Sequence, residues 1–277
     1  KIVEKSGIDK SKENGYNETV LVIALQDGFT MRRSLIVEDI LLIEPAYKNK
    51  YPPIGLMKIA YFHRYIMHDY VRFAKGRLPE GLENKKWDRV YVTTLFTFEW
   101  ENTKKALQYA LSVVKPGGKV FTGGILATLR PEWIAKEFPT VINNTGLLNH
   151  EGTLGLKGEE CIDTLPLDYG ILDDIKDEYK YPAEDAYFTY MTRGCGMNCT
   201  FCAVKTLEPT YEPYVSISDS IKRIDKEFGP KRDLLLMDNN VLRSPRFDQI
   251  IDEIKALGFE KGATFVNPKT GKTVVRH

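Results

Sequence analysis

Two short runs of apolar residues constrain the fold of this chain more than any other feature of its sequence. Residues 20–25 read VLVIAL, and residues 39–43 read DILLI. Both runs have the length of a strand, and strands that are apolar at successive positions are typical of a sheet covered on both faces. The first half of the chain is therefore expected to contain a buried sheet.

Helical patterns alternate with these runs. Apolar residues at spacings of three and four predict a helix over residues 56–73, in which His63 and Met67 lie on the packing face as core residues. Further elements are expected as a strand at 89–95, a helix at 103–114 ended by Gly117 and Gly118, a strand at 119–122 and a helix at 131–138. This alternation predicts an α/β fold with a parallel, Rossmann-like sheet.

The segment between the two halves is harder to interpret. Residues 1–16 are polar and are expected to form a loose lead-in. The LPLDY sequence at 165–169 and the acidic residues at 173–178 indicate a linker with solvated charges. We therefore expect a Rossmann-like domain with its linker over residues 1–180 and a second unit over residues 181–277.

The second unit returns to the alternation of strand and helix. Strands are expected at 186–192, 233–237 and 263–266, with helices at 218–228 and from Ser244 onward, where Ser244 is the N-cap and Pro245 the first helical residue. Three strand–helix steps are too few to close a barrel of eight. The strand at 263–266 is then expected to form an unpaired sheet edge.

A loop with three cysteines follows the first of these strands. Cys195, Cys199 and Cys202 form a C-x3-C-x2-C pattern, and thiolates are the ligands of soft metals and iron–sulfur clusters. A cubane has four irons, so three thiolates leave one iron open to a small molecule. Structural zinc with a histidine, or a disulfide with a spare thiol, are the alternatives. Cys161 lies far from the loop and is interpreted as a buried or incidental thiol.

Cys195, Cys199 and Cys202, with Phe201 before the last of them, resemble the cluster loop of the radical S-adenosylmethionine (radical SAM) superfamily. The resemblance implies a [4Fe–4S] cluster whose fourth iron is chelated by the amino and carboxylate groups of SAM. One electron from the reduced cluster then cleaves SAM to methionine and a 5′-deoxyadenosyl radical. The core of that family is a partial barrel of about six strand–helix units.

The same resemblance implies further SAM contacts. Asp238, Asn239 and Asn240 follow a predicted strand, at the position where the family contacts the SAM amino group. Asp238 would accept from the methionine ammonium, and Phe201 would shape the adenine side. Because the carboxyl ends of parallel strands meet at one edge, these residues and the cysteine loop are expected to share one face.

A second resemblance lies in the first half. The YPPIGL sequence at 51–56, Thr93 with Leu95, and Gly123 with Gly124 resemble the cobalamin-binding (B12-binding-like) domain that precedes many radical SAM cores. That family's pattern is D-x-H-x-x-G, then S-x-L, then G-G. Lys50 and Pro52 stand at the positions of the aspartate and of the cobalt-ligating histidine. Either cobalamin binds without a protein ligand to cobalt, or the domain has kept the fold without the cofactor.

Composition limits the partners and the cellular location expected for this protein. The net charge is +1, and 28% of residues are charged, so nothing favours nucleic acid or a membrane surface as a partner. No apolar run approaches the roughly 18 residues of a membrane span. Four cysteines in 277 residues do not form a secreted disulfide scaffold, and the reducing cytoplasm is the expected location.

These observations lead to one main hypothesis about function. The chain is expected to be a radical SAM enzyme that acts on an unknown substrate, with methyl transfer as one reaction type and an electron donor such as flavodoxin or ferredoxin as a partner. The alternative is a truncated or degenerate iron–sulfur or zinc module without turnover. A start at Lys1 without methionine and the three strand–helix steps lead us to expect a piece of a longer protein that lacks the second half of the core.

Overall fold

The computed structural model describes residues 18–24, 30–78, 82, 84–156, 159, 161–268 and 270–277, and the side chains from residue 37 onward. The expected lead-in at 1–16 lies outside these residues. Strands β1 (Glu18–Ala24) and β2 (Thr30–Ile36) pair in antiparallel fashion with each other alone. The strand expected at 20–25 is therefore present up to Ala24, but its assignment to the buried sheet was wrong.

Five parallel strands form the main sheet. They are β3 (Asp39–Glu44), β4 (Tyr70–Lys75), β5 (Trp87–Thr94), β6 (Val114–Gly124) and β7 (Ile142–Asn144), in the spatial order β4-β3-β5-β6-β7. All neighbouring pairs are parallel. The predicted Rossmann-like sheet is confirmed, and its order reverses between β3 and β5, which is where such sheets bind ligands.

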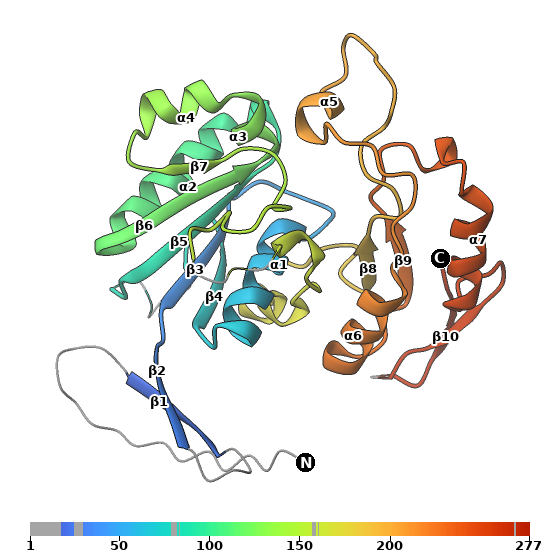
Figure 1. The fold of residues 1–277 in the computed structure, drawn as a ribbon, viewed down its shortest axis with the longest axis horizontal. Coiled ribbons are helices and arrows are strands. Elements are labelled where there is room, and N and C mark those ends of the chain that lie inside the picture. Colours follow the sequence, from blue (N-terminus) through green and yellow to red (C-terminus); the bar gives the residue numbers. More distant parts are fainter. Residues whose placement is uncertain are drawn as a thin grey trace.

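Both faces of this sheet are covered, as the apolar run of β3 predicts. Ile40 and Leu42 belong to one buried cluster, and Leu41 and Ile43 belong to another. Helices α2 (Trp100–Val113), α3 (Ile125–Leu129) and α4 (Pro131–Glu137) cover one face, while α1 (Ile54–Tyr61) covers the other (Figure 1). The four apolar side chains of β3, at positions 40–43, are fully buried, so each face of β3 is part of a core.

The helix expected over 56–73 is only half correct. Helix α1 runs on into a π-helical turn, Phe62–Ile66, and the chain then enters strand β4. His68 has φ 62°, a left-handed conformation that ends a helix, and the Asp69 carboxylate accepts from the backbone N–H of Glu38 at 2.9 Å. His63 is fully buried, as expected of a core residue, and Met67 is partly buried against the same cluster.

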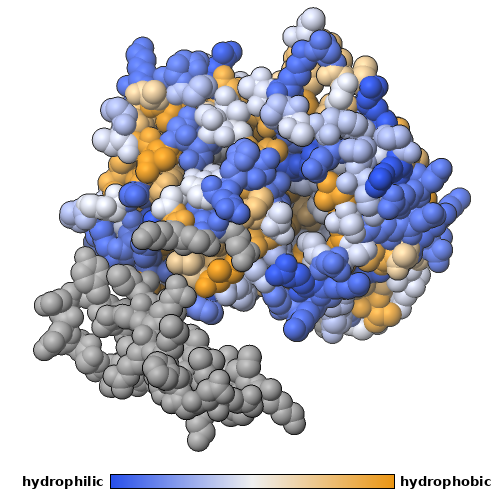
Figure 2. All heavy atoms as spheres, in the orientation of Figure 1, coloured by the Kyte–Doolittle hydropathy of each residue, from blue (hydrophilic) through white to orange (hydrophobic). Residues whose placement is uncertain are grey.

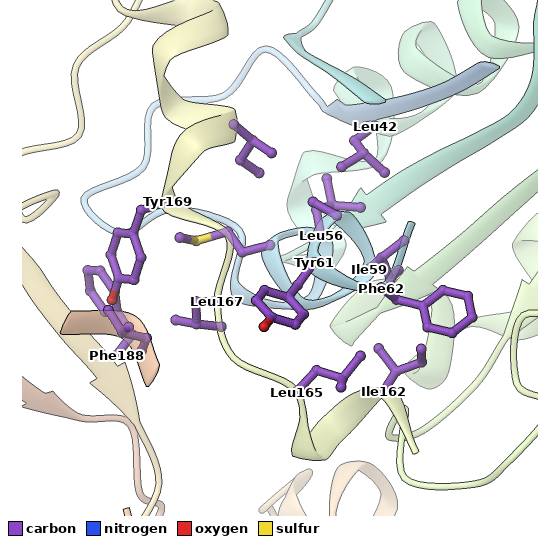
Figure 3. Packing of buried hydrophobic residues seen from close by; sticks show 14 of the residues in the cluster. Leu42, Leu56, Ile59, Tyr61, Phe62, Ile162, Leu165, Leu167, Tyr169 and Phe188 are labelled. Atoms are coloured by element: carbon purple, nitrogen blue, oxygen red, sulfur yellow. The ribbon is translucent and has the colours of Figure 1, made fainter. Parts of the chain in front are cut away.

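The segment after β7 is part of the core, so its interpretation as a linker was wrong, although the acidic side chains Asp173, Asp177 and Glu178 are exposed as expected. Leu165, Leu167 and Tyr169 are buried beside the π-helical turn and α1, together with the short 3-10 helices η3 (Ile162–Thr164) and η4 (Tyr169–Ile175) (Figure 3). The buried cluster continues to Phe188 of the second half. One hydrophobic core therefore connects the two halves of the chain.

The second half begins with a parallel pair of strands. β8 (Ala186–Thr189) pairs with β9 (Asp233–Leu236), and α6 (Ser218–Phe228) lies between them in sequence. The helices α5 (Val204–Leu207), η5 (Val241–Arg243) and α7 (Phe247–Ala256) follow the two strands. Ser244 accepts from the Arg246 N–H at 3.0 Å, but α7 begins at Phe247 with Arg246 as its N-cap, so the prediction of Ser244 as the N-cap and Pro245 as the first helical residue was wrong.

The third predicted strand has a different partner from the expected one. β10 (Thr264–Val266) pairs with β11 (Thr273–Val275) as an antiparallel hairpin and is no edge of the parallel sheet. The chain after β11 returns to β9, where the Leu234 N–H donates to the His277 carbonyl at 2.8 Å. The expectation of an unpaired strand here was wrong because a local hairpin satisfies its hydrogen bonds.

The surface is that of a mixed, mostly polar chain. Figure 2 shows hydrophilic residues over most of one face, interrupted by smaller groups of hydrophobic residues. In the part of the chain that the structure describes, no helix combines the length and the apolar character that crossing a membrane requires.

Candidate active site

A cavity of about 600 Å³ lies at the carboxyl edge of the main sheet. The segments that follow β3, β5, β6 and β7 line it from the first half, and residues after β8, in α5 and after β9 line it from the second half. This is the reversal point of the strand order, and it is also where the two halves face each other. Its position and size are those of a ligand site.

The glycine pair and the threonines predicted from sequence meet at this cavity. Thr93, Gly123 and Gly124 all line it. A Cβ on Gly124, which has φ 104°, would lie 2.3 Å from the Thr94 carbonyl oxygen, and a Cβ on Gly123 would lie 3.1 Å from the Asn144 carbonyl oxygen. Gly124 therefore has to be glycine, and Gly123 leaves little room for a side chain, where β6 approaches its neighbouring strands at the cavity edge.

Thr94 fixes this corner further. Its hydroxyl donates to the Gly123 carbonyl at 2.9 Å and accepts from the Ala127 N–H at 3.0 Å. The turn from β6 into α3 is thus held by the end of β5. Among the described residues that line the cavity there is no histidine and no cysteine, and Lys50 and Pro52 are part of the wall.

A buried ion pair closes the cavity floor beside β3. The Glu44 carboxylate is 1% exposed, lies 2.8 Å from the Lys75 ammonium and accepts from the Tyr181 hydroxyl. The Lys75 ammonium also lies 4.4 Å from the centre of the Tyr179 ring. Burial raises the pKa of Tyr181, and the Glu44 charge adds to this effect, so the hydroxyl stays protonated as a donor. The contact joins the ends of β3 and β4 to the start of the second half.

The cysteine loop follows β8 on the other side of the cavity. The thiols of Cys195, Cys199 and Cys202 are free and half-buried. Their number and chemistry fit a soft metal or an iron–sulfur cluster. Within the described residues, however, no three or more histidine, cysteine, aspartate or glutamate side chains are grouped so as to hold a metal ion. The donor set fits such a group, but the thiols do not converge in this structure.

Two carboxylates hold the backbone that leads into this loop. Asp238 accepts from the Met191 N–H at 3.1 Å and from the N–H and hydroxyl of Thr192. Glu208 accepts from the Gly194 N–H at 2.7 Å. The structure therefore brings Asp238 to the cysteine loop, as expected from its place after a strand, and uses its oxygens to hold residues 191–192.

The other predicted SAM contacts lie nearby. The Asn240 amide is 3.6 Å from the Cys195 sulfur, and the Asn239 amide donates to Glu208 at 3.0 Å. Asn239 also lines the cavity. Phe201 is 91% exposed, so its ring packs against nothing that would shape an adenine site here.

A row of charged side chains crosses the cavity wall, and sequence reasoning missed most of it. The Lys58 ammonium lies 2.8 Å from one oxygen of Asp163, and the Arg193 guanidinium lies 3.4 Å from the other. Arg193 also lies 3.4 Å from Glu208, and its guanidinium stacks 4.2 Å from the centre of the Tyr190 ring. Arg193 lies two residues before Cys195, whereas Lys58, Asp163 and Glu208 belong to no sequence motif.

Burial and the neighbouring charges shift the pKa values of this row in opposite directions. Burial lowers the pKa of Lys58, and the Asp163 charge offsets part of that effect. Burial alone would raise the pKa of Asp163, but the Lys58 and Arg193 charges hold that pKa below its usual range. Asp163 is therefore ionised between two cations at neutral pH.

Comparison with known proteins identifies a relative of this fold. No family model matches the chain, and no curated protein sequence matches it. Two solved structures of the cobalamin-dependent S-adenosylmethionine radical enzyme OxsB are similar to it. One, with aqua-cobalamin and S-adenosylmethionine bound, gives a TM-score of 0.57 at 16% identity, over 82% of this chain and 38% of that chain. The other, with aqua-cobalamin bound, gives a TM-score of 0.56 at 14% identity, over 86% of this chain and 41% of that chain.

The chain thus spans about two fifths of the length of the solved structures that it matches. The similarity covers more than four fifths of this chain, including parts of both halves. The chain therefore has the fold of the corresponding part of a cobalamin-dependent radical SAM enzyme.

Proposed function

We propose that this chain carries the cobalamin-binding-like domain (residues 1–180) and the start of the radical core (residues 181–277) of a radical SAM enzyme. The observation that carries the proposal is that Glu208 lines both the cavity of the glycine pair and an adjoining pocket that contains Cys195. The glycine pair lies at the edge of the main sheet, and the loop of Cys195, Cys199 and Cys202 follows the strand on the opposite wall. The fold similarity to OxsB supports the same function.

In this proposal Cys195, Cys199 and Cys202 hold a [4Fe–4S] cluster, which when bound supplies the electron that cleaves SAM. The residues of the chain have supporting tasks. Asp238 and Glu208 hold the backbone before Cys195, and Asn240, 3.6 Å from the Cys195 sulfur, can donate to a thiolate. Asn239 offers a polar group to SAM at the cavity wall. The wall is mostly apolar, which would limit the access of water to bound SAM.

We propose that the same cavity takes cobalamin. Thr93, Gly123 and Gly124 form the part of the wall where backbone can approach a flat ligand closely, because side chains there are small or absent. The described lining holds no histidine, so cobalamin would bind here without a protein ligand from that residue type. A one-electron donor of the flavodoxin or ferredoxin type, and a reducing compartment such as the cytoplasm, complete the proposal.

Anaerobic reconstitution with iron and sulfide tests the cluster. We expect about four irons per chain and a brown chromophore in the natural sequence, and in Cys161→Ala, because Cys161 lies outside the loop. Cys199→Ala should lose most of the iron. After reduction in the presence of SAM, 5′-deoxyadenosine should appear only in proteins that hold the cluster.

Other outcomes would favour another function. One zinc and no iron, or a cluster that never cleaves SAM, would support a metal-binding module without turnover.

Incubation with hydroxocobalamin followed by desalting tests the second cofactor. We expect retained cobalt and a spectrum that does not change when His150, an exposed histidine of the first half, is replaced by alanine. Loss of all cobalt on desalting would remove cobalamin and methyl transfer from the proposal and leave the SAM chemistry standing.

A further inference from the structure

The charged row on the cavity wall links the first half of the chain to the cysteine loop. Lys58 belongs to α1, Asp163 to η3, and Arg193 lies two residues before Cys195. The distances are 2.8 Å from Lys58 to Asp163 and 3.4 Å from Asp163 to Arg193. Each oxygen of Asp163 thus faces one cation, one from each half.

The row continues into the backbone of the loop. Arg193 lies 3.4 Å from one oxygen of Glu208, and the other oxygen of Glu208 accepts from the Gly194 N–H at 2.7 Å. The Arg193 backbone exchanges two hydrogen bonds of 3.0 Å with Glu212. Gly194 has φ 63°, and a Cβ there would lie 2.5 Å from the Thr210 carbonyl oxygen. The residues immediately before Cys195 are therefore held from several sides.

The row is mostly shielded from solvent, and this burial determines how much its ion pairs contribute to stability. The side chains of Lys58 and Arg193 are each 12% exposed, that of Glu208 is 11% exposed and that of Asp163 is 24% exposed. Exposed ion pairs contribute little, whereas removing one partner of a buried pair leaves a charge without compensation. Loss of the Asp163 charge would leave the Lys58 ammonium without its carboxylate partner and Arg193 with Glu208 as its remaining one.

We propose that Asp163 is a positioning residue that fixes the cysteine loop relative to the cavity through Arg193 and Glu208. The inference rests on the proposed function for its purpose, since it assigns to Asp163 the alignment of the loop with the ligand cavity. Asp163 touches no reacting atom in this role. The contacts themselves are independent of any bound cofactor.

Hydrogen exchange on the full chain without iron tests the proposal. In Asp163→Asn we expect the amides of residues 193–202 to exchange at least tenfold faster, while amides of β3 and β5 keep their rates. The matched control is Asp219→Asn, which removes a carboxylate that is 96% exposed and should change neither region. Asp163→Glu should restore most of the protection, because a longer carboxylate can still reach both cations.

A double substitution keeps the proposal testable if Asp163→Asn folds poorly. Lys58→Met with Asp163→Asn removes one cation together with the anion, so it should be more stable than Asp163→Asn alone. Unchanged exchange at residues 193–202, or equal acceleration in the sheet and the loop, would overturn the proposal. So would a double variant less stable than Asp163→Asn.

A second measurement separates this inference from the proposed function. In reconstituted protein, Asp163→Asn should shift the midpoint potential of the iron chromophore to more positive values, because one negative charge beside Arg193 is removed, and Asp219→Asn should not. Failure to take up iron would count against the proposed function and leave the exchange result intact. Faster loop exchange with an unchanged potential would overturn the electrostatic part of the inference.

Discussion

At the scale of single residues, Gly124 shows most directly how the cavity edge depends on the absence of a side chain. Its φ of 104° is a conformation that L side chains rarely adopt, and the Thr94 carbonyl lies where a Cβ would be. Gly117 has a similar φ of 81° but has nothing within 4 Å of a Cβ position. Substitutions at the two positions therefore distinguish the effect of backbone strain, present at both, from that of steric overlap, present only at Gly124.

We expect Gly124→Ala to lower the free energy of unfolding by about 2–4 kcal/mol, from a strained backbone and an overlap with Thr94. Gly117→Ala should lower it by only about 1 kcal/mol, because it adds strain without overlap. Urea unfolding followed by tryptophan fluorescence measures both. Equal losses in the two variants would show that the close approach to Thr94 contributes nothing.

At the scale of elements, the 3-10 helix η4 has a buried acid at its N-terminus. The Asp168 side chain is fully buried, accepts from the Gly170 N–H at 2.8 Å and lies 2.8 Å from the Arg64 guanidinium. Burial raises the pKa of Asp168 from 3.8 to about 6, although Arg64 and Gly170 oppose this shift. Desolvation thus outweighs the ion pair at this helix end.

The raised pKa predicts a pH dependence of stability. The folded state holds the Asp168 proton more tightly than the unfolded chain, so its contribution is complete below about pH 4 and is lost as the pH rises through about 6. Relative to Asp168→Asn, the natural protein should lose on the order of 2 kcal/mol of unfolding free energy between pH 4 and 7. Denaturant titrations at several pH values measure this difference.

The neighbouring Asp173 provides the control for that prediction. It is exposed, so Asp173→Asn should run parallel to the natural protein at every pH. The burial argument would be contradicted if the free energy of unfolding of the natural protein, relative to that of Asp168→Asn, stayed constant or increased as the pH rises from 4 to 7.

The elements also show where prediction from sequence succeeded. The apolar run of β3 and the helix expected at 103–114 were predicted correctly from local patterns, and Ala106, Leu107 and Ala110 of α2 are buried, whereas Leu111 is 37% exposed. Strand β4 was predicted as helix, since Val71 falls on both a helical stripe and a strand face. Pairing with β3, thirty residues away, decided between them.

At the scale of the whole molecule, the two halves share one hydrophobic core. Phe188 of β8 is 3% exposed and lies 6.1 Å from Tyr51 of the first half, measured between ring centres. All three tryptophans, Trp87, Trp100 and Trp133, lie in the first half. Their fluorescence therefore reports on the first half alone, while changes can be introduced in the second.

We expect Phe188→Ala to lower the free energy of unfolding by about 3–5 kcal/mol, the range for a large buried aromatic residue. The tryptophan transition and the far-UV circular dichroism transition should move together, because the core is continuous. Leu242→Ala, at a residue that is 76% exposed, is the control and should move neither. A shift in circular dichroism with an unchanged tryptophan transition would mean that the halves unfold separately.

Only part of the candidate site could be predicted from sequence, namely the residues that belong to local patterns. Cys195, Cys199, Cys202, Gly123 and Gly124 could be found because their chemistry or their backbone conformation requires those residue types at those spacings. Lys58, Asp163 and Glu208 could not be found, since Lys58 and Asp163 meet across 105 residues and none belongs to a local pattern.

The sequence by itself determined the buried parallel sheet, the turn that requires Gly124 and the presence of three thiols on one loop. These depend on periodicity, on backbone conformation and on covalent spacing, which act within a few residues. Only the tertiary structure decided that β4 is a strand, that residues 165–175 join the core, and that Asp238 holds the loop backbone. Those outcomes depend on desolvation and on contacts between distant segments, which exist only once the chain has folded.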